Sequence, residues 1–191
     1  ETTIDTLNRD ASLTRDDVKQ AIASLTIGSA SCAVLLTHRD ISRAGHQLLG
    51  GTGRANTKFH QLCQSGADEA VASGMQPLMD TDSERLMHEG IAVGAETFDR
   101  FLTALGWRTA EIDQTFCHQV GVAHRRLMLE RLELSAARDY STVEWLGNTG
   151  SVALTITMAL GIEPGRVKAG DKIAMLGIGS GINVVMLGVE W

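Results

Sequence analysis

The chain has 191 residues, of which 43% are apolar and 21% charged, proportions that are ordinary for a globular protein with a sizeable core. The formal net charge of −6 argues against a nucleic-acid-binding face, because the densest basic spot is only the doublet Arg125-Arg126. A membrane span is not expected, because no apolar run approaches the roughly 18 residues that cross a bilayer.

The start of the chain and its cysteines suggest a cellular compartment. The sequence begins at Glu1 with neither an initiating Met nor a basic, signal-like region. The three cysteines, Cys32, Cys63 and Cys117, are odd in number and form no pair with metal-site spacing, which favours reduced thiols. Together these features predict a soluble, cytoplasmic protein whose true N-terminus lies upstream.

The first part of the chain predicts two helices, two strands and a long loop. Residues 1–8 indicate the end of a helix, and Thr14 is a suitable N-cap for a second one. The continuous apolar run at residues 32–37 is typical of a strand buried on both faces. Residues 46–54 predict another strand, loosened by glycines. The polar stretch at residues 56–79 predicts a loop that covers or lines a site.

The second part of the chain alternates between helical and extended patterns. Asp80 or Asp82 can cap a long amphipathic helix that stops at Gly106. Further strands are expected at residues 114–118, 140–143, 172–178 and 182–189, and further helices at residues 120–132 and 151–160. This alternation predicts an α/β fold in which a sheet lies between helices.

Three motifs combine a polar residue with the end of an apolar segment. From the residues alone, His118 is more simply a structural histidine, and Asn148 a turn residue that tolerates positive φ. The glycines on either side of Ser180 invite a nucleotide-binding interpretation, but that fingerprint needs a following helix, and an extended apolar segment follows here. A His, an Asn and a glycine-lined turn are also the groups that enzymes use to stabilise a negative oxygen in thioester chemistry.

Other candidate side chains have simpler explanations. Adjacent strand residues point to opposite faces of a sheet, so Cys117 is expected to turn away from the side of His118 and not to act as a nucleophile. Cys32 is expected in the core and Cys63 in a structural role. His124 is expected on the surface of its helix, and nothing in the sequence predicts a metal site.

The motifs also make the chain similar to a known family. The stretches that carry the resemblance are Leu25-Thr26-Ile27-Gly28-Ser29, Leu105-Gly106-Trp107, Ile112-Asp113-Gln114, His118-Gln119-Val120, Gly147-Asn148, Lys168-Ala169-Gly170-Asp171-Lys172-Ile173-Ala174 and Leu176-Gly177-Ile178-Gly179-Ser180-Gly181-Ile182-Asn183. The chain resembles the thiolase superfamily and, within it, the β-ketoacyl-acyl carrier protein synthase III group. It is most similar to the thiolase-like enzymes that join two long-chain acyl-CoA molecules head to head at the start of bacterial olefin biosynthesis. The resemblance covers nearly the whole chain but only the C-terminal part of a family member.

The resemblance implies a thiolase-like, layered αβαβα fold built from two similar βαβαβαββ halves. On that template, residues 32–37 and 46–54 are the last two strands of the first half. Residues 1–79 would then be the end of the N-terminal half, and residues 80–191 the whole C-terminal half.

The resemblance further implies an acyltransferase that performs Claisen condensation of acyl thioesters to a β-ketoacyl product. His118 and Asn148 would stabilise the enolate, and the backbone N–H groups of Gly179, Ser180 and Gly181 would complete an oxyanion hole. The nucleophilic Cys, and a Glu base in the non-decarboxylating branch, belong to the missing N-terminal half. The substrates would be acyl-CoA or acyl and malonyl groups on acyl carrier protein, with no further cofactor, and the enzyme would be a homodimer. The alternative left open is a non-catalytic, half-length partner subunit of a complete condensing enzyme.

Overall fold

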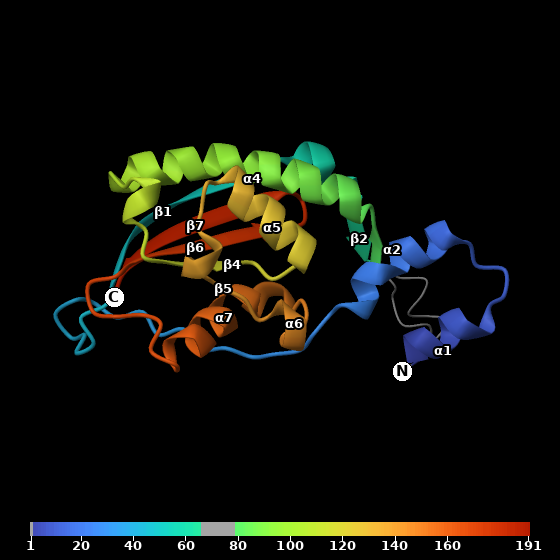
Figure 1. Cartoon of the computed structure of the whole chain (residues 1–191), viewed down its shortest axis with the longest axis horizontal. Coiled ribbons are helices and arrows are strands. Elements are labelled where there is room, and N and C mark those ends of the chain that lie inside the picture. Colours follow the sequence, from blue (N-terminus) through green and yellow to red (C-terminus); the bar gives the residue numbers. More distant parts are fainter. Residues whose placement is uncertain (1, 66–78) are drawn as a thin grey trace.

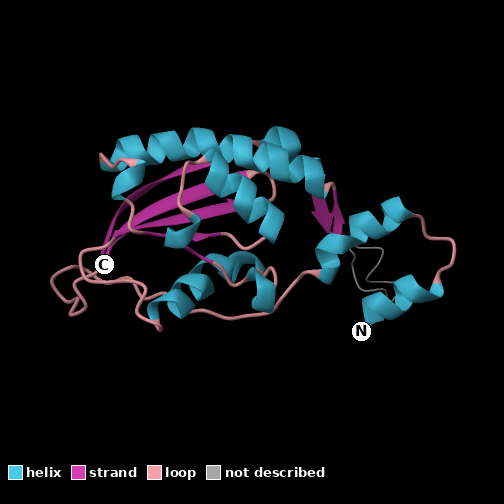
Figure 2. Ribbon diagram, in the orientation of Figure 1, coloured by secondary structure: helices cyan, strands magenta, loops and turns pink. Residues whose placement is uncertain are grey.

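The computed structural model describes residues 2–65 and 79–191. Its main body is a five-stranded sheet with helices on both faces, and the N-terminal helices extend to one side (Figures 1 and 2). The helices are α1 (Thr2–Arg9), α2 (Arg15–Leu25), α4 (Ser83–Leu105), α5 (Val122–Arg131), α6 (Val143–Leu146) and α7 (Ala153–Ile162), and the strands are β1 (Gln47–Ala55), β2 (Cys63–Ser65), β3 (Met79–Thr81), β4 (Gln114–Cys117), β5 (Asp139–Tyr140), β6 (Lys172–Gly179) and β7 (Asn183–Glu190).

The main sheet has the strand order β1-β7-β6-β4-β5. β6 and β7 form an antiparallel hairpin, whereas β4 runs parallel to both β5 and β6. Parallel strands need long crossover connections. The connection from β4 to its neighbour β5 contains α5, and the connection from β5 to β6, which lies on the other side of β4, contains α6 and α7. β2 and β3 pair separately as a two-stranded ribbon.

Side chains of β6 alternate between two apolar layers. Ala174, Leu176 and Ile178 pack into a core cluster with residues of α4 and α5. Ile173 and Met175 point the other way, into a cluster completed by residues of α7. This period of two is what a strand covered on both faces requires, and it confirms the predicted α/β arrangement of a sheet between helices.

The long helix α4 begins and ends where its caps predict. The side chain of Asp82 accepts a hydrogen bond from the backbone N–H of Arg85 at 3.1 Å, which satisfies one free N–H of the first turn. Gly106 ends the helix in the left-handed conformation, with φ of 64°. Just beyond it, Trp107 packs edge-to-face on the fully buried Phe101, with 5.9 Å between ring centroids.

The apolar run at residues 32–37 is not a strand, contrary to the prediction. Val34, Leu35 and Leu36 are 66%, 86% and 74% exposed, and Cys32, expected in the core, is exposed as well. A strand needs a neighbour for its backbone N–H and C=O groups, and no strand of the described ranges pairs with this run. The run has the composition of a buried strand, but among the described residues no strand lies beside it to form a sheet.

The strand predicted at residues 46–54 is present as β1, but it lies in an unexpected sheet. β1 pairs antiparallel with β7 along its whole length. This pairing covers the edge of the β6–β7 hairpin, which would otherwise present unpaired backbone groups. β1 therefore shares a sheet with β4 to β7, whereas the assignment of residues 1–79 to the first half and of residues 80–191 to the second stays a prediction.

The long loop predicted at residues 56–79 is partly structured. A 3₁₀ turn at Thr57–Leu62 leads into β2, and residues 66–78 lie outside the described residues. Among the helices of the described ranges, none is long and apolar enough to cross a membrane.

Candidate active site

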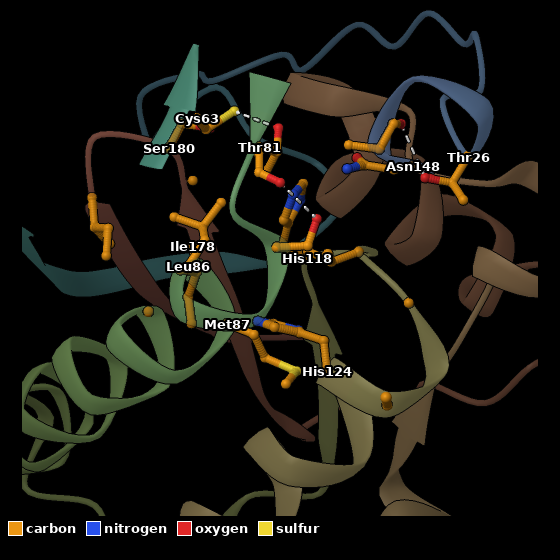
Figure 3. Close-up of a pocket in the computed structure, with 18 of the residues that line it drawn as sticks. Thr26, Cys63, Thr81, Leu86, Met87, His118, His124, Asn148, Ile178 and Ser180 are labelled. Atoms are coloured by element: carbon orange, nitrogen blue, oxygen red, sulfur yellow. Dashed lines mark hydrogen bonds between the residues drawn. The ribbon is translucent and has the colours of Figure 1, made fainter. Parts of the chain in front are cut away.

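A cavity of about 430 Å³ lies where the ends of β4 and β6 approach α2, the β2–β3 ribbon and the starts of α4 and α5 (Figure 3). Most of its lining residues are apolar. The polar residues that line it are Thr26, Cys63, Thr81, Ser83, His118, His124, Asn148 and Ser180. The structure thus brings His118 and Asn148, which are 30 positions apart in sequence, to one cavity together with Gly179 and Ser180.

His118 reaches the cavity from the carboxyl end of β4. Its backbone N–H donates to the carbonyl oxygen of Leu176 at 3.0 Å, which extends the pairing of β4 with β6 and fixes the residue. Burial lowers the pKa of the imidazole below 6.5, because the charged form loses its hydration. A neutral imidazole has one N–H and one lone pair, so His118 can donate a hydrogen bond at neutral pH without carrying a charge.

The backbone of Asn148 is held against the segment that follows α2. Its N–H donates to the carbonyl oxygen of Thr26 at 2.8 Å, and its carbonyl oxygen accepts from the N–H of Gly28 at 2.9 Å. The two segments lie so close that a Cβ on Gly28 would collide with the backbone oxygen of Leu146. Gly28 is therefore needed for this approach.

The side chain of Asn148 leaves a donor for a ligand. Its Oδ1 accepts a hydrogen bond from the N–H of Gly150 at 3.0 Å, while its Nδ2 donates to no group in the described part of the chain. Figure 3 shows Asn148 and His118 at the same cavity, reached from different elements. Two neutral donors in a mainly apolar cavity are an arrangement suited to stabilising a developing oxyanion.

The glycine-containing turn between β6 and β7 forms another wall. Gly179 and Ser180 line the cavity, and the side chain of Asn183 donates to the carbonyl oxygen of Ser180 at 2.9 Å, which stabilises the turn. Gly181, with φ of 123°, belongs to the same turn but does not line the cavity. The use of these N–H groups as an oxyanion hole stays a prediction.

His124 is buried and not on the helix surface, contrary to the prediction. It is 6% exposed, lines the cavity from the first turn of α5, and its Nδ1 finds no hydrogen-bond partner within the described ranges. Burial, and secondarily the neighbouring His118, lower its pKa from 6.5 to about 4. The spacing of His124 from the buried Met128 and Leu129 on α5 is the helical signal that could have revealed its position.

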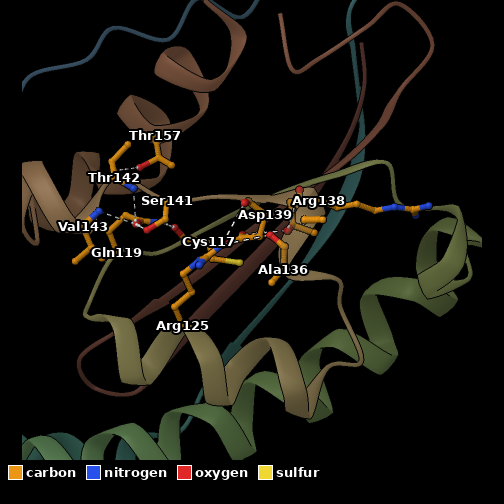
Figure 4. Close-up of polar contacts among 12 residues, drawn as sticks. Cys117, Gln119, Arg125, Ala136, Arg138, Asp139, Ser141, Thr142, Val143 and Thr157 are labelled. Carbon is orange, nitrogen blue, oxygen red and sulfur yellow. Dashed lines mark hydrogen bonds and ion pairs between the residues drawn. The ribbon is translucent and has the colours of Figure 1, made fainter. Parts of the chain in front are cut away.

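Gln119, which belongs to the stretch His118-Gln119-Val120 but is not among the predicted site residues, makes the densest set of hydrogen bonds beside the site (Figure 4). It is 3% exposed, and its Nε2 donates to the carbonyl oxygen of Cys117 at 2.6 Å. Its Oε1 accepts from the N–H groups of Thr142 and Val143 at 3.0 and 3.1 Å, and the hydroxyl of Ser141 lies at 3.2 Å. The side chain therefore joins the end of β4 to the start of α6.

A buried ion pair next to this cluster fastens α5 to β5. Arg125 Nε lies 2.5 Å from Oδ2 of Asp139, whose side chain is fully buried, and the hydroxyl of Thr115 donates to Oδ1 at 3.0 Å. Arg125 also donates to the backbone oxygen of Asp139 at 3.2 Å. The pair stabilises the helix that carries His124.

The cysteines differ in their relation to the cavity. Cys117 is buried outside it, and burial raises the pKa of its thiol, which disfavours the reactive thiolate; that Cys117 is not a nucleophile stays a prediction. Cys63 lines the cavity, and its sulfur accepts a hydrogen bond from the hydroxyl of Thr81 at 3.6 Å. The structural role expected for Cys63 stays a prediction. No group of three or more potential metal ligands occurs within residues 2–65 and 79–191.

Comparison with known families assigns the second part of the chain. Residues 102–191 match the family described as 3-oxoacyl-[acyl-carrier-protein (ACP)] synthase III C terminal. The match covers β4 to β7 and slightly less than half of the chain.

Known relatives extend the similarity over nearly the whole chain. An acyl-CoA:acyl-CoA alkyltransferase of Shewanella oneidensis is 36% identical over an alignment of 192 residues that covers 99% of this chain and 54% of that protein. A β-ketoacyl-[acyl-carrier-protein] synthase III of Pseudomonas aeruginosa is 21% identical over 86% of this chain and 50% of that protein. A crystal structure of an OleA variant from Xanthomonas campestris with bound lauric acid and lauroyl-CoA superimposes with a TM-score of 0.82 and 28% identity, over 95% of this chain and 51% of that one.

These similarities confirm the thiolase-like α/β fold, and the chain spans about half the length of the relatives it matches. The matched region, residues 102–191, contains all the predicted site residues. The opposite walls of the cavity, formed by Thr26, Ile27, Cys63 and Thr81, precede this region. The cavity therefore lies between the matched region and the chain before it.

Proposed function

We propose that the protein carrying this chain is an acyltransferase that joins two acyl thioesters by Claisen condensation to a β-ketoacyl product. The observation that carries the proposal is that His118 and Asn148 offer neutral donors to one mainly apolar cavity. Similarity to an acyl-CoA:acyl-CoA alkyltransferase and to β-ketoacyl-[acyl-carrier-protein] synthases III supports the same class of reaction.

In this proposal, an acyl group is first held as a thioester on a Cys outside this chain. Loss of a proton, or of CO₂, from the α-carbon of a second acyl or malonyl thioester gives an enolate, whose oxygen accepts hydrogen bonds from His118 and Asn148. The α-carbon then attacks the Cys-bound carbonyl, a C–C bond forms, and the Cys thiolate leaves. Backbone N–H groups of Gly179 and Ser180, the members of the predicted glycine turn that line the cavity, stabilise the oxyanion of the attacked carbonyl.

The residue types suit a substrate with an apolar chain. A neutral donor stabilises the enolate without forming the stable ion pair that a Lys would form. Each such donor is worth about 10²–10³-fold in rate. Leu86, Met87 and Ile178 give the cavity apolar walls, and each methylene buried against such walls stabilises binding by about 0.8 kcal/mol. We therefore favour long-chain acyl-CoA as the substrate over malonyl groups on carrier protein.

The proposal includes the rest of the enzyme. An N-terminal half supplies the Cys and, for proton removal, a Glu base; the enzyme is a cytoplasmic homodimer of fatty-acid or olefin biosynthesis and uses no cofactor beyond its thioester substrates. The half-length match to the relatives supports a missing half. The exposed apolar side chains of Val34, Leu35 and Leu36 support it too, because contiguous apolar surface of this kind marks a contact with further protein.

The test uses the complete protein and measures acylation and condensation separately. Asn148→Ala is expected to lower product formation from long-chain acyl-CoA by about 10²–10³-fold, while intact-mass spectrometry still detects one added acyl group. Undiminished product formation would refute the role of Asn148. A product assay with malonyl-carrier protein distinguishes the two substrate classes.

The matched control is Cys63→Ser, which removes the thiol that lines the cavity and leaves a side chain of similar size. Both acylation and condensation are expected to continue in this variant. Loss of the acyl adduct would place the nucleophile in this chain and overturn the assignment of an external Cys.

A further inference from the structure

The side chain of Gln119 turns back over the residue that precedes it. Its Nε2 donates to the carbonyl oxygen of Cys117 at 2.6 Å, so the amide closes a small loop around the backbone of His118. On the other side, the N–H of His118 is bonded to Leu176. The backbone that carries His118 is thus held from both directions.

The oxygen of the same amide caps a different element. α6 is a single turn, and its N-cap residue, Thr142, makes no side-chain capping hydrogen bond. The N–H groups of Thr142 and Val143 donate instead to Gln119 Oε1. One turn of helix is not stable alone, and its first N–H groups need acceptors, so Gln119 fixes where α6 starts.

α6 leads directly to Asn148. The N–H of Gly147 bonds the carbonyl oxygen of Val143 at 3.1 Å, and Asn148 follows. The hydroxyl of Ser141 has only one proton to donate, and its Oγ lies closer to Oε2 of Glu144, at 2.8 Å, than to Oε1 of Gln119, at 3.2 Å. The backbone N–H groups of Thr142 and Val143 are therefore the firm contacts of Gln119 on this side.

We propose that Gln119 is the positioning residue that sets the placement of His118 relative to Asn148. The inference rests on the proposed function, because it matters only if these two residues act together on one enolate. Gln119 lines no part of the cavity, so it acts through its neighbours and not on the substrate. Its near-complete burial makes the contacts rigid, since an amide that loses them leaves unpaired groups that water cannot reach.

The first test is Gln119→Met in the complete protein, which keeps the length of the side chain and removes the amide. A misplacement of about 1 Å costs about 100-fold in rate, and we expect that loss in kcat for condensation. Acylation of the Cys does not need the enolate donors and is expected to stay within about two-fold. Equal loss of both steps, or unchanged condensation, would overturn the inference.

Gln119→Glu gives a second readout that a structural role alone does not predict. The carboxylate keeps an acceptor for the N–H groups of α6 but repels the carbonyl oxygen of Cys117. Protonation restores a donor to that oxygen, so the condensation rate relative to wild type is expected to rise as the pH falls through the pKa of the introduced carboxyl group, with relative acylation unchanged. A ratio that does not change with pH would contradict the role, and this variant carries the test if Gln119→Met does not fold.

Thr97→Val is the matched control. Thr97 is fully buried on α4, bonds Val93 at 2.7 Å and lies outside the cavity lining, so its loss removes a buried hydrogen bond elsewhere. It is expected to lower Tm without changing either step. If His118→Ala loses condensation but Gln119→Met does not, only the present inference fails; if His118→Ala retains it, the proposed function fails first.

Discussion

Replacing His124 with Phe should make the stability of the protein less dependent on pH. His124 is 6% exposed, its Nδ1 has no partner among the described residues, and its pKa is lowered from 6.5 to about 4 by burial and by His118. Phe has a similar shape and no nitrogen. Because an unpaired buried polar atom costs about 1–3 kcal/mol, the variant is expected to be at least as stable as wild type at neutral pH.

The sign of the pH effect follows from the two pKa values of His124. At pH 7 the imidazole is neutral in both states and the full stability is present. Below pH 6.5 the unfolded chain binds a proton that the folded chain does not, so the free energy of unfolding falls until the folded state is protonated near pH 4. At 1.36 kcal/mol per pKa unit, His124 should account for a loss of about 2 kcal/mol between pH 7 and pH 5.

The assay is urea unfolding of the complete wild-type protein and of His124→Phe at both pH values. His118, whose pKa is lowered in the same direction by burial, is present in both proteins, so the contribution of its own burial cancels in the comparison. His88→Gln is the control, because His88 lies on the exposed face of α4 and its replacement leaves the cavity intact. An identical loss of stability on acidification in wild type and His124→Phe would refute the reasoning.

Three further substitutions test contacts that hold the site. Asp139→Ala leaves Arg125, which is 25% exposed, without its partner and should cost about 3–5 kcal/mol of unfolding free energy, measured by denaturation. Asp82→Ala removes only the N-cap of α4 and should cost about 1 kcal/mol in the same assay, so a larger loss than for Asp139→Ala would contradict this ranking. Gly28→Ala brings a methyl group onto the backbone oxygen of Leu146 and should lower condensation more than ten-fold through misplacement of the adjoining segment, with acylation as the unaffected control step.

The elements that the sequence predicts well are those whose signals are local. α4 is bounded by a capping Asp82 and a left-handed Gly106, and the alternating residues of β6 need no distant information. His118 and Asn148 were placed together through motif resemblance, and the structure brings them to one cavity. These features depend on neighbours in sequence or on whole motifs.

The errors concern features that depend on tertiary partners. Residues 32–37 have strand composition, but a strand exists only where another strand accepts its hydrogen bonds. Pairing likewise decided which sheet β1 joins. Gln119 and His124 are polar residues on either side of the apolar segment 120–123, and only the approach of α6 and the closing of the cavity show what they contact.

The placement of Asn148 depends on contacts from two directions. On one side it is set by Gln119 through α6, and on the other by backbone hydrogen bonds to Thr26 and Gly28. The chain passes from Gly28 almost directly into the exposed run at residues 32–37. If further protein pairs with this run as a strand, the pairing also restrains the segment that holds Asn148. We therefore expect the enolate site to reach its working geometry only when that strand is formed, so that completing the fold and completing the site are one event.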